Sequence, residues 1–232
     1  MAHEHYIIVT TWNILWVLFS ISAPLASIAG ILTPKWLVGT IESGRTNLSQ
    51  PLAPDDRGTP SIGIINHCIR FSAVIGGREK LTCMYYGNEF GDIACDEWKA
   101  SIVFLMIGTG ILSVVVFMAL IGFCFQSCGR KSLFQIGGLI QAIGGLFLVI
   151  GLVLYPAGWG NRRVEKLCAI RYQKADPFVM NECSFGWAFY ATLGATIGAF
   201  VCAFLATQAE KSTSSDKVQD KILEGQTCIC LI

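Results

Sequence analysis

Four long apolar segments alternate with polar segments along this chain of 232 residues. The three later segments hold no Asp, Glu, Lys or Arg, and each has about the 20 residues that an α-helix needs to cross a bilayer. The first segment is too long for the apolar part of a cleaved signal peptide, and no Lys or Arg precedes it. The pattern therefore predicts four transmembrane helices, at about residues 7–32, 100–124, 133–155 and 185–206.

Composition narrows the class of protein further. Hydrophobic residues make up 53% of the chain and charged residues 14%, whereas soluble domains have about 25% charged residues. The net charge of +1 comes with no basic stretch, which argues against a nucleic-acid partner. No charged side chain lies within the predicted spans, so a proton pump or secondary transporter is not expected. The lipid bilayer is the first partner that this composition predicts.

No group of residues in the sequence indicates catalysis or a cofactor. We find no nucleophile beside a base, no phosphate-binding glycine loop and no paired carboxylates. His67 beside Cys68 is the one hint of a metal site, but the spacing to Cys83 fits no usual zinc pattern. We therefore expect no cofactor and no bound metal, and an enzyme acting on lipids is the least favoured class of function.

The first polar loop, residues 33–99, contains three runs that are rich in β-branched and aromatic residues. These runs cover residues 36–41, 62–71 and 81–86, and Gly76-Gly77 between the last two is typical of a hairpin. We predict a small antiparallel sheet built mainly from this loop, and we expect a recognition surface there. The whole chain is expected to form one four-span domain, with a turn at 125–132, a second loop at 156–184 and a tail at 207–232.

The two larger loops contain one candidate cysteine pair each, Cys68 and Cys83 in the first and Cys168 and Cys183 in the second. Pairing within each loop would close about 15 residues and contribute about 3 kcal/mol in the chain-entropy model. Four cysteines allow three connectivities, and free thiols are a further alternative. Cys95, close to the second span, is left without an assigned role.

Four spans place both termini on one side of the membrane. That side carries five Lys and Arg against twelve on the loop side, so the positive-inside rule by itself would put the loops in the cytoplasm. The paired cysteines point the other way, because disulfides persist in oxidising compartments. Asn47-Leu48-Ser49 in the first loop is also an N-glycosylation acceptor. We therefore expect extracellular or lumenal loops and cytoplasmic termini, in the plasma membrane or an internal membrane.

Glycines recur at helical spacing in the last two spans. They are Gly137, Gly144 and Gly151 in the third span, and Gly194 and Gly198 in the fourth. Small residues let helix backbones approach closely in a bilayer, which favours packing within the bundle. The alternative is a face for a helix of another protein or of a second copy. Gln141, in the middle of the third span, predicts a hydrogen bond to a neighbouring helix.

Four further cysteines lie close to the expected cytoplasmic face, Cys124 and Cys128 after the second span and Cys228 and Cys230 near the C-terminus. Cysteines beside a membrane are candidates for S-palmitoylation, and reduced thiols are the alternative. The apolar residues at the C-terminus, 229–232, could add a strand to a groove of the PDZ type, although such endings are common by chance.

Three stretches resemble one known family. They are GLVLYPAGWG at residues 151–160, CSFGWAFY at 183–190 and SSDKVQ at 214–219. The chain is similar over essentially its whole length to the LHFPL (lipoma HMGIC fusion partner-like) tetraspan family, within the broad claudin-like superfamily. The resemblance implies a four-helix bundle with a sheet formed mostly by the first loop and completed by a strand from the second.

The first loop also carries most of the superfamily signature of a Trp, then Gly-Leu-Trp, then two cysteines. Trp36 matches the first element, Gly63 begins the second, and Cys68 and Cys83 match the pair. Ile65 stands where the second Trp would be, which argues against claudin-like strand assembly.

The family resemblance implies a non-enzymatic accessory or scaffold protein that binds a channel, receptor or adhesion protein in the same membrane. Its expected binding surfaces are the sheet around Trp36 and Cys68 and a helix face. The alternative is a claudin-like protein of cell–cell adhesion or barriers that acts between two membranes.

Overall fold

The computed structural model describes residues 7–40, 58–72, 79–87, 90–93, 95–122, 127–128, 131–168, 174–215, 218, 220, 223 and 228–231. The chain divides into two compact units, and each contains a part of all four long helices. The terminal unit comprises Met1–Ala26, Ile107–Leu148 and Gly194–Ile232. The loop unit comprises Ser27–Met106 and Val149–Leu193.

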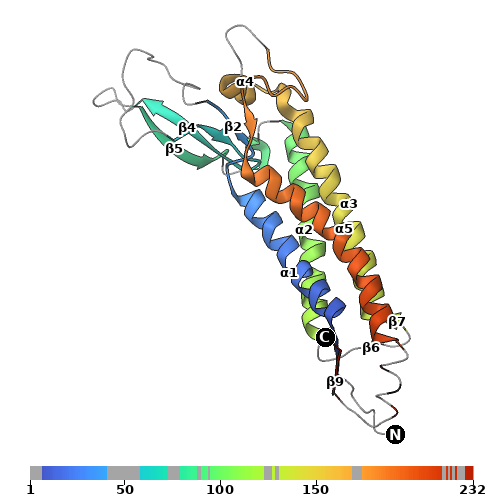
Figure 1. The fold of residues 1–232 in the computed structure, drawn as a ribbon. Helices are drawn as coiled ribbons and strands as arrows, with labels where there is room; N and C mark the ends of the chain where they lie inside the picture. The colour runs from blue at the N-terminus through green and yellow to red at the C-terminus, as the bar shows by residue number, and fades with distance from the viewer. Residues whose placement is uncertain are drawn as a thin grey trace. The chain divides into compact units, whose positions relative to one another are not determined.

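Four helices in the described part of the chain are long and apolar enough to cross a membrane, which confirms the predicted multi-pass class. They are α1 (Thr11–Leu32), α2 (Asp96–Gly122), α3 (Leu133–Ala157) and α5 (Trp187–Thr213), and Figure 1 labels them along the chain. A shorter helix, α4 (Arg162–Cys168), lies in the second loop.

Helix α1 begins at Thr11 and not near residue 7 as the apolar pattern predicted. The hydroxyl oxygen of Thr10 accepts a hydrogen bond from the backbone N–H of Asn13 at 3.3 Å, which caps the helix. The four apolar-rich residues before it form strand β1 (Ile7–Thr10), which pairs in parallel with β9 (Cys228–Leu231). Hydropathy does not separate a strand from a helix in so short a run.

Two other helices extend beyond their apolar segments. Helix α2 begins at Asp96, because Asp96 and Glu97 interact favourably with the partial positive charge of a helix N-terminus. Lys99 adds a salt bridge to Asp96 at 3.0 Å. Helix α5 continues to Thr213, so the first part of the predicted tail is helical. Each predicted span nonetheless coincides with one helix.

The outward faces of the four helices are apolar. Exposed large hydrophobic residues come from each of them, including Leu18, Phe117, Leu139 and Phe204. Several polar residues of the spans are instead buried, among them Ser20, Ser101, Gln141 and Thr192. Helices in a bilayer place apolar side chains toward lipid and keep polar groups inside the bundle, so this distribution fits a lipid environment.

The core of the terminal unit combines apolar packing with a buried polar chain. Trp16 packs in one cluster with Val115, Cys202 and Ala206. The indole N–H of Trp16 donates to Oε1 of Gln141 at 3.0 Å, and Nε2 of Gln141 donates to the hydroxyl of Ser20 at 2.6 Å. Gln141 is 1% exposed. These bonds confirm that Gln141 joins α3 to a neighbouring helix.

Replacing Gln141 by Leu is expected to lower the free energy of unfolding by about 0.6–2 kcal/mol, the range measured for hydrogen bonds between membrane helices. The measurement is detergent-induced unfolding of the purified protein. A double-mutant cycle with Trp16→Phe isolates the contact, since the Phe ring fills most of the space but has no N–H donor. Strictly additive losses in the double variant would contradict the assigned hydrogen bond.

The glycines of the last two spans differ in their surroundings. At four of them an added methyl group would meet a side chain of another helix, at 3.0 Å for Gly137, 3.1 Å for Gly144, 2.6 Å for Gly151 and 3.6 Å for Gly198. These distances agree with packing inside each unit. At Gly194 no described heavy atom lies within 4 Å of such a group, so internal packing gives no reason for this glycine.

The terminal unit also contains two pairs of short strands. Strands β6 (Ser127–Cys128) and β7 (Lys131–Ser132) form an antiparallel pair inside the predicted turn. Strands β1 and β9 pair residue by residue, from Ile7 opposite Cys228 to Thr10 opposite Leu231. The two ends of the chain therefore lie side by side.

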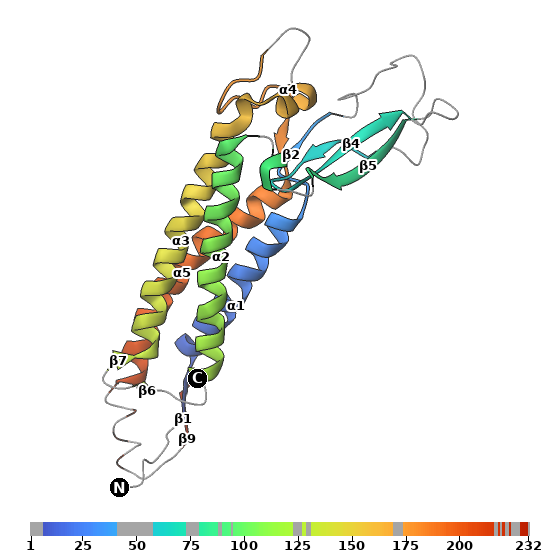
Figure 2. The ribbon, with the colours of Figure 1, turned by 180° about the vertical axis from the view of Figure 1, so that it is seen from behind.

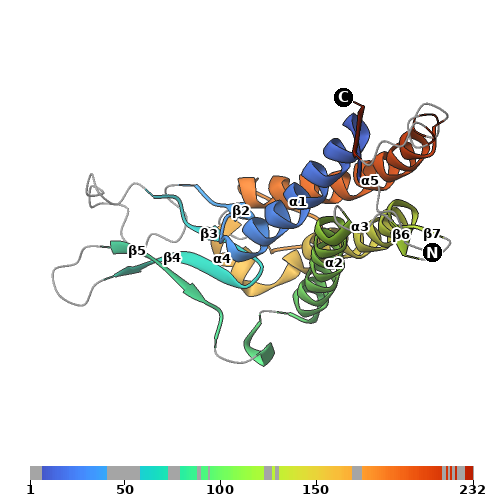
Figure 3. The ribbon, with the colours of Figure 1, turned by 90° about the horizontal axis from the view of Figure 1, so that it is seen from below.

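The loop unit contains an antiparallel sheet with the strand order β5-β4-β3-β2-β8. The strands are β2 (Leu37–Val38), β3 (Ser61–Ile62), β4 (Asn66–Ser72), β5 (Glu79–Tyr85) and β8 (Ser184–Phe185). Figure 2 shows the long β4 and β5 side by side, and Figure 3 shows β5, β4, β3 and β2 in succession. Four strands come from the first loop and one from the second, as expected for a claudin-like fold.

The run at 62–71 was predicted as one strand, and this is wrong. The chain reverses after Ile62, so Ile62 pairs with His67 and Ser61 pairs with Cys68. The N–H of Gly63 donates to the carbonyl of Asn66 at 2.8 Å and closes the turn. A propensity for strand does not record a reversal of direction, and the four-residue turn carries no Pro or Asn-Gly signal.

Gly63 is also in close contact with the chain that leaves α1. A methyl group at Gly63 would lie 2.7 Å from Cα of Pro34 and 2.8 Å from the carbonyl oxygen of Thr33, and both are backbone atoms. Gly63→Ala is therefore expected to destabilise the protein by about 1–3 kcal/mol through overpacking. Thermal unfolding checks this, with Gly91→Ala as the control because no described atom lies within 4 Å of a methyl group there. Equal stability of the two variants would contradict overpacking at Gly63.

Candidate recognition site in the loop unit

An aromatic cluster of Trp36, Trp98, Tyr155 and Trp159 forms the base of the loop unit. The ring of Tyr155 lies 4.8 Å from Trp36, 5.3 Å from Trp98 and 6.2 Å from Trp159 between centroids. Two of the three buried indole N–H groups are hydrogen-bonded, since Trp36 donates to the carbonyl of Gly30 at 2.7 Å and Trp98 to that of Tyr155 at 2.9 Å, whereas that of Trp159 has no partner among the described residues. The cluster connects the ends of α1, α2 and α3 within this unit.

The rings of this cluster lie in the interior of the loop unit. Trp36 has no exposed surface, so it belongs to the core beside the sheet. Trp98, Tyr155 and Trp159 lie near the ends of spans, where aromatic side chains commonly occupy the membrane interface, but they are buried. Position near a span end does not distinguish an interfacial ring from a ring that packs under a folded loop. Other aromatic residues near span ends are exposed, namely Trp12, Trp187 and Tyr190.

The predicted pairing of cysteines within each loop agrees with the structure, where both pairs lie at disulfide distance. Cys68 and Cys83 stand directly opposite each other on β4 and β5, with an S–S separation of 1.95 Å. Cys168, at the end of α4, lies 1.98 Å from Cys183 between sulfur atoms. The first bridge fixes the β4–β5 pair, and the second connects α4 to the residue before β8.

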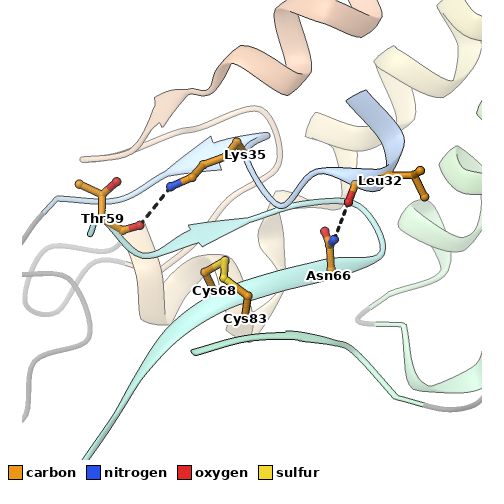
Figure 4. The surroundings of a disulfide bond; sticks show 6 residues. All are labelled: Leu32, Lys35, Thr59, Asn66, Cys68 and Cys83. Atoms are coloured by element: carbon orange, nitrogen blue, oxygen red, sulfur yellow. Dashed lines mark hydrogen bonds between the residues drawn. A yellow bond between two sulfur atoms is a disulfide. The ribbon is translucent and has the colours of Figure 1, made fainter. Parts of the chain in front are cut away.

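Side-chain hydrogen bonds attach the sheet to the end of α1. Figure 4 shows the amide of Asn66, which donates to the carbonyl of Leu32 at 2.8 Å, near the Cys68–Cys83 bridge. The ammonium of Lys35 donates to the carbonyl of Thr59 at 3.5 Å in the same view. These bonds hold β3 and β4 against the segment that follows α1.

Cys95 has a packing environment that the sequence did not indicate. Its thiol lies 3.7 Å from the carbonyl oxygen of Gly158, and the side-chain amide of Asn161 lies 3.9 Å from its sulfur. Burial raises the pKa of the Cys95 thiol, so the reactive thiolate is disfavoured. We interpret Cys95 as a contact between the start of α2 and the chain that leads into α4.

Helix α4 owes its position to Asn161. The Oδ1 atom of Asn161 accepts the backbone N–H groups of Arg163 at 2.8 Å and Val164 at 3.1 Å, and its amide donates to the carbonyl of Gly158 at 2.7 Å. This N-cap fixes where the helix begins. The spacing from Arg163 to Lys166 and Leu167 then places these three side chains on one helix face.

Three side chains from the sheet and α4 form a stack. The rings of His67 and Tyr86 lie parallel with centroids 5.0 Å apart, and the guanidinium of Arg163 lies 4.7 Å from the centre of the Tyr86 ring. The hydroxyl of Tyr86 donates to the carbonyl of Gly63 at 2.5 Å. Burial, and secondarily the charge of Arg163, lowers the pKa of His67 below its usual 6.5.

The depressed pKa of His67 predicts a pH dependence. The unfolded chain binds a proton near pH 6.5 while folded His67 does not, so stability should fall as the pH falls below about 6.5 toward the folded pKa. Arg163→Gln removes one cause and is expected to raise the pKa of His67. Histidine ring NMR titration measures the pKa of His67 in the unchanged protein and in the variant, and the signals are few because the chain has only three histidines. An unchanged His67 titration in the variant would contradict the role of Arg163.

The outer edge of the sheet carries exposed apolar side chains. β5 is an edge strand, and no other described strand pairs with its outer side. Met84 and Tyr85 at its end are 39% and 65% exposed, and Phe90 in the following short helix is exposed as well. An exposed strand edge beside aromatic side chains is a common binding surface for an added strand or loop.

Several sequence-predicted sites lie outside the described residues or are described only as backbone. Asn47 and Cys124 lie outside the described residues. Cys128 lies in β6, and Cys228 and Cys230 lie in β9. The C-terminal strand is paired with β1, and no motif in either segment indicates this pairing.

The spans, the disulfide-linked loops and the sheet define a tetraspan membrane protein with an ordered loop domain. Residues 12–210 match the family model described as lipoma HMGIC fusion partner-like protein. The chain is 42% identical to the LHFPL tetraspan subfamily member 2a protein of Danio rerio over 230 residues, covering 98% of this chain and 99% of that protein. It is 39% identical to the LHFPL tetraspan subfamily member 2 protein of Homo sapiens over 231 residues, with the same coverage.

A more distant relative is the LHFPL tetraspan subfamily member 3 protein of Danio rerio, which is 26% identical over 84% of this chain and 79% of its own length. The chain belongs to the LHFPL tetraspan family. This confirms the family that the three sequence stretches indicated.

Proposed function

We propose that this protein is a non-enzymatic accessory or scaffold subunit that binds another membrane protein, a channel, receptor or adhesion protein, in the same membrane. The observation that carries the proposal is the free edge of β5 with the exposed side chains of Met84 and Tyr85. The Cys68–Cys83 bridge holds β5 to β4, so this edge is expected to be rigid. A stiff, partly apolar edge suits recognition of an extracellular segment of the partner.

The test is purification of the tagged protein from its native membrane in mild detergent, followed by identification of whatever co-elutes in a fixed ratio. A channel, receptor or adhesion protein at constant stoichiometry is the expected result. Tyr85→Lys is expected to lower that ratio at least about tenfold, because a charge is placed where an apolar contact is needed. Val179→Lys is the control, since Val179 is also an exposed apolar residue of the loop unit but lies away from β5 in the sequence.

Elution of the protein alone, or only with copies of itself, would overturn the accessory role. The adhesion or barrier alternative would then be examined through assembly at cell contacts and paracellular conductance. An equal loss of partner in both Lys variants would remove β5 as the binding surface.

The same proposal places the loops outside the cytoplasm and both termini inside it. Disulfide-distance cysteine pairs in both loops support an oxidising environment there. The pairing of β1 with β9 supports a common side for the termini. Asn47→Gln tests this topology, since loss of a glycosidase-sensitive mass shift is expected if Asn47 faces the lumen during synthesis.

We further propose that the cytoplasmic cysteines, Cys124, Cys128, Cys228 and Cys230, are acylation sites that hold the chain ends at the membrane. A PDZ-type partner would compete with β1 for β9, because both would use the backbone of the last residues. Acyl exchange with a mass tag on single Cys→Ser variants counts the modified sites, and four unmodified thiols would end this proposal.

A further inference from the structure

A cavity of about 540 Å³ lies within the loop unit, between the inner strands of the sheet and helix α4. Its lining is strongly asymmetric in charge. Three of the lining side chains are cationic, Arg70, Arg163 and Lys166, and no carboxylate is among the residues that line it. Ile69 and Leu167 contribute apolar wall. A pocket of this size accommodates a small organic molecule.

Two of these cations, Arg70 and Arg163, are held in place by contacts within the fold, and the third, Lys166, is exposed. Arg70 on β4 is 8% exposed and donates from Nη2 to the carbonyl of Gly58 at 2.7 Å. Arg163 lies over the Tyr86 ring, and Lys166 follows one turn later on the same face of α4. Lys99 and Asp96 form the one salt bridge between described residues, so neither Arg163 nor Lys166 is neutralised by a described carboxylate.

A second observation, an unpartnered buried polar atom, also points to a ligand site. His67 also lines the cavity and is 6% exposed, yet its Nδ1 atom has no hydrogen-bond partner among the described residues. Buried polar atoms in folded proteins are almost always hydrogen-bonded. Burial, and secondarily the charge of Arg163, lowers the pKa of His67, so this ring is not expected to add a further positive charge. An anion would compensate these charges and accept N–H donors from this lining.

We propose that this cavity binds a small amphiphilic anion, a molecule that carries one phosphate, sulfate or carboxylate group on an apolar or aromatic body. The anionic group is bound by Arg163 and Lys166 with Arg70 behind them. The body packs against Ile69 and Leu167. This site is separate from the β5 edge and does not depend on the proposed accessory function.

Equilibrium dialysis of radiolabelled phenyl phosphate against the full-length protein in nanodiscs of phosphatidylcholine tests the proposal. Saturable binding at one site per chain is expected. Arg163→Gln and Lys166→Gln should each weaken it about tenfold, the effect of losing one charge-assisted hydrogen bond. Arg162→Gln is the matched control, because Arg162 is exposed on the same helix and does not line the cavity. It should bind like the unchanged protein.

Absence of saturable binding by phenyl phosphate, phenyl sulfate and benzoate to the unchanged protein would overturn the proposal. Equal weakening by Arg162→Gln would also overturn it, since the effect would then come from overall charge. Thermal unfolding of each variant without ligand verifies that it is folded. If Arg163→Gln does not fold, Lys166→Gln provides the test, because the Lys166 side chain is exposed and its replacement is not expected to affect folding.

Two competitors show which parts of the ligand contribute to binding, and a change of lipid shows where the natural anion comes from. Inorganic phosphate should displace phenyl phosphate weakly and phenol should not, because both parts of the ligand contribute to binding. Nanodiscs that contain phosphatidylglycerol distinguish the source of the anion. If the apparent Kd for phenyl phosphate rises in them, a lipid headgroup occupies the site, and an unchanged Kd assigns it to a soluble anion.

Discussion

Trp36→Ala is expected to lower the free energy of unfolding by about 3–5 kcal/mol, the cost of removing a large aromatic side chain from a packed core. Trp36 is completely buried and contacts rings from two helices, with centroids 4.8 Å from Tyr155 and 5.8 Å from Phe189. Its loss also leaves the carbonyl of Gly30 without the indole donor. The measurement is thermal or detergent-induced unfolding of the purified protein.

Trp187→Ala provides a matched control, because it deletes the same side chain at a position that is 54% exposed. Its cost is expected to stay below about 1 kcal/mol. If the two variants unfolded together, the aromatic cluster would not be the core of the loop unit. A surface role for Trp36 would instead reduce partner binding without changing stability, so the two readouts separate the possibilities.

Cys68→Ser is expected to destabilise the protein by about 3 kcal/mol, which corresponds to the 15-residue separation of the two cysteines. The described side chains of β5 from residue 82 to 85 are exposed, so side-chain packing adds little to the pairing of β5 with β4. The variant should be retained in the endoplasmic reticulum, and surface biotinylation measures this retention. Normal surface levels with an unshifted thermal transition would count against the bridge.

The double variant Cys68→Ser/Cys83→Ser distinguishes the bond from the individual residues. It should be no less stable than the less stable of the two single variants, because either substitution already removes the whole bridge. A further large loss in the double variant would mean that the thiols contribute separately through packing.

Hydropathy located all four helices, because a bilayer requires a minimum apolar length and the sequence meets it four times. The cysteine pairs were also predictable, since each loop holds one pair at a separation that closes a modest loop. Both inferences depend on properties of single segments. They needed no knowledge of which segments meet in three dimensions.

What the sequence left open depends on contacts between distant segments. The reversal at Gly63 is imposed by the chain at Thr33 and Pro34, some thirty residues earlier. The charged cavity requires β4 to face α4, and neither segment alone contains a signal that predicts this contact. Arg163 and Lys166 looked like ordinary loop charges for this reason. Pairing of β1 with β9 likewise joins the two ends of the chain.

The place of β2 between β3 and β8 has a consequence for biosynthesis. β8 immediately precedes α5, so the ribosome must pass the third span and the second loop before β2 can acquire its second neighbour. Trp36 meets Phe189 only after the last span has emerged. A nascent chain that stops after three spans therefore exposes an unfinished sheet edge, which quality control can recognise as incomplete insertion.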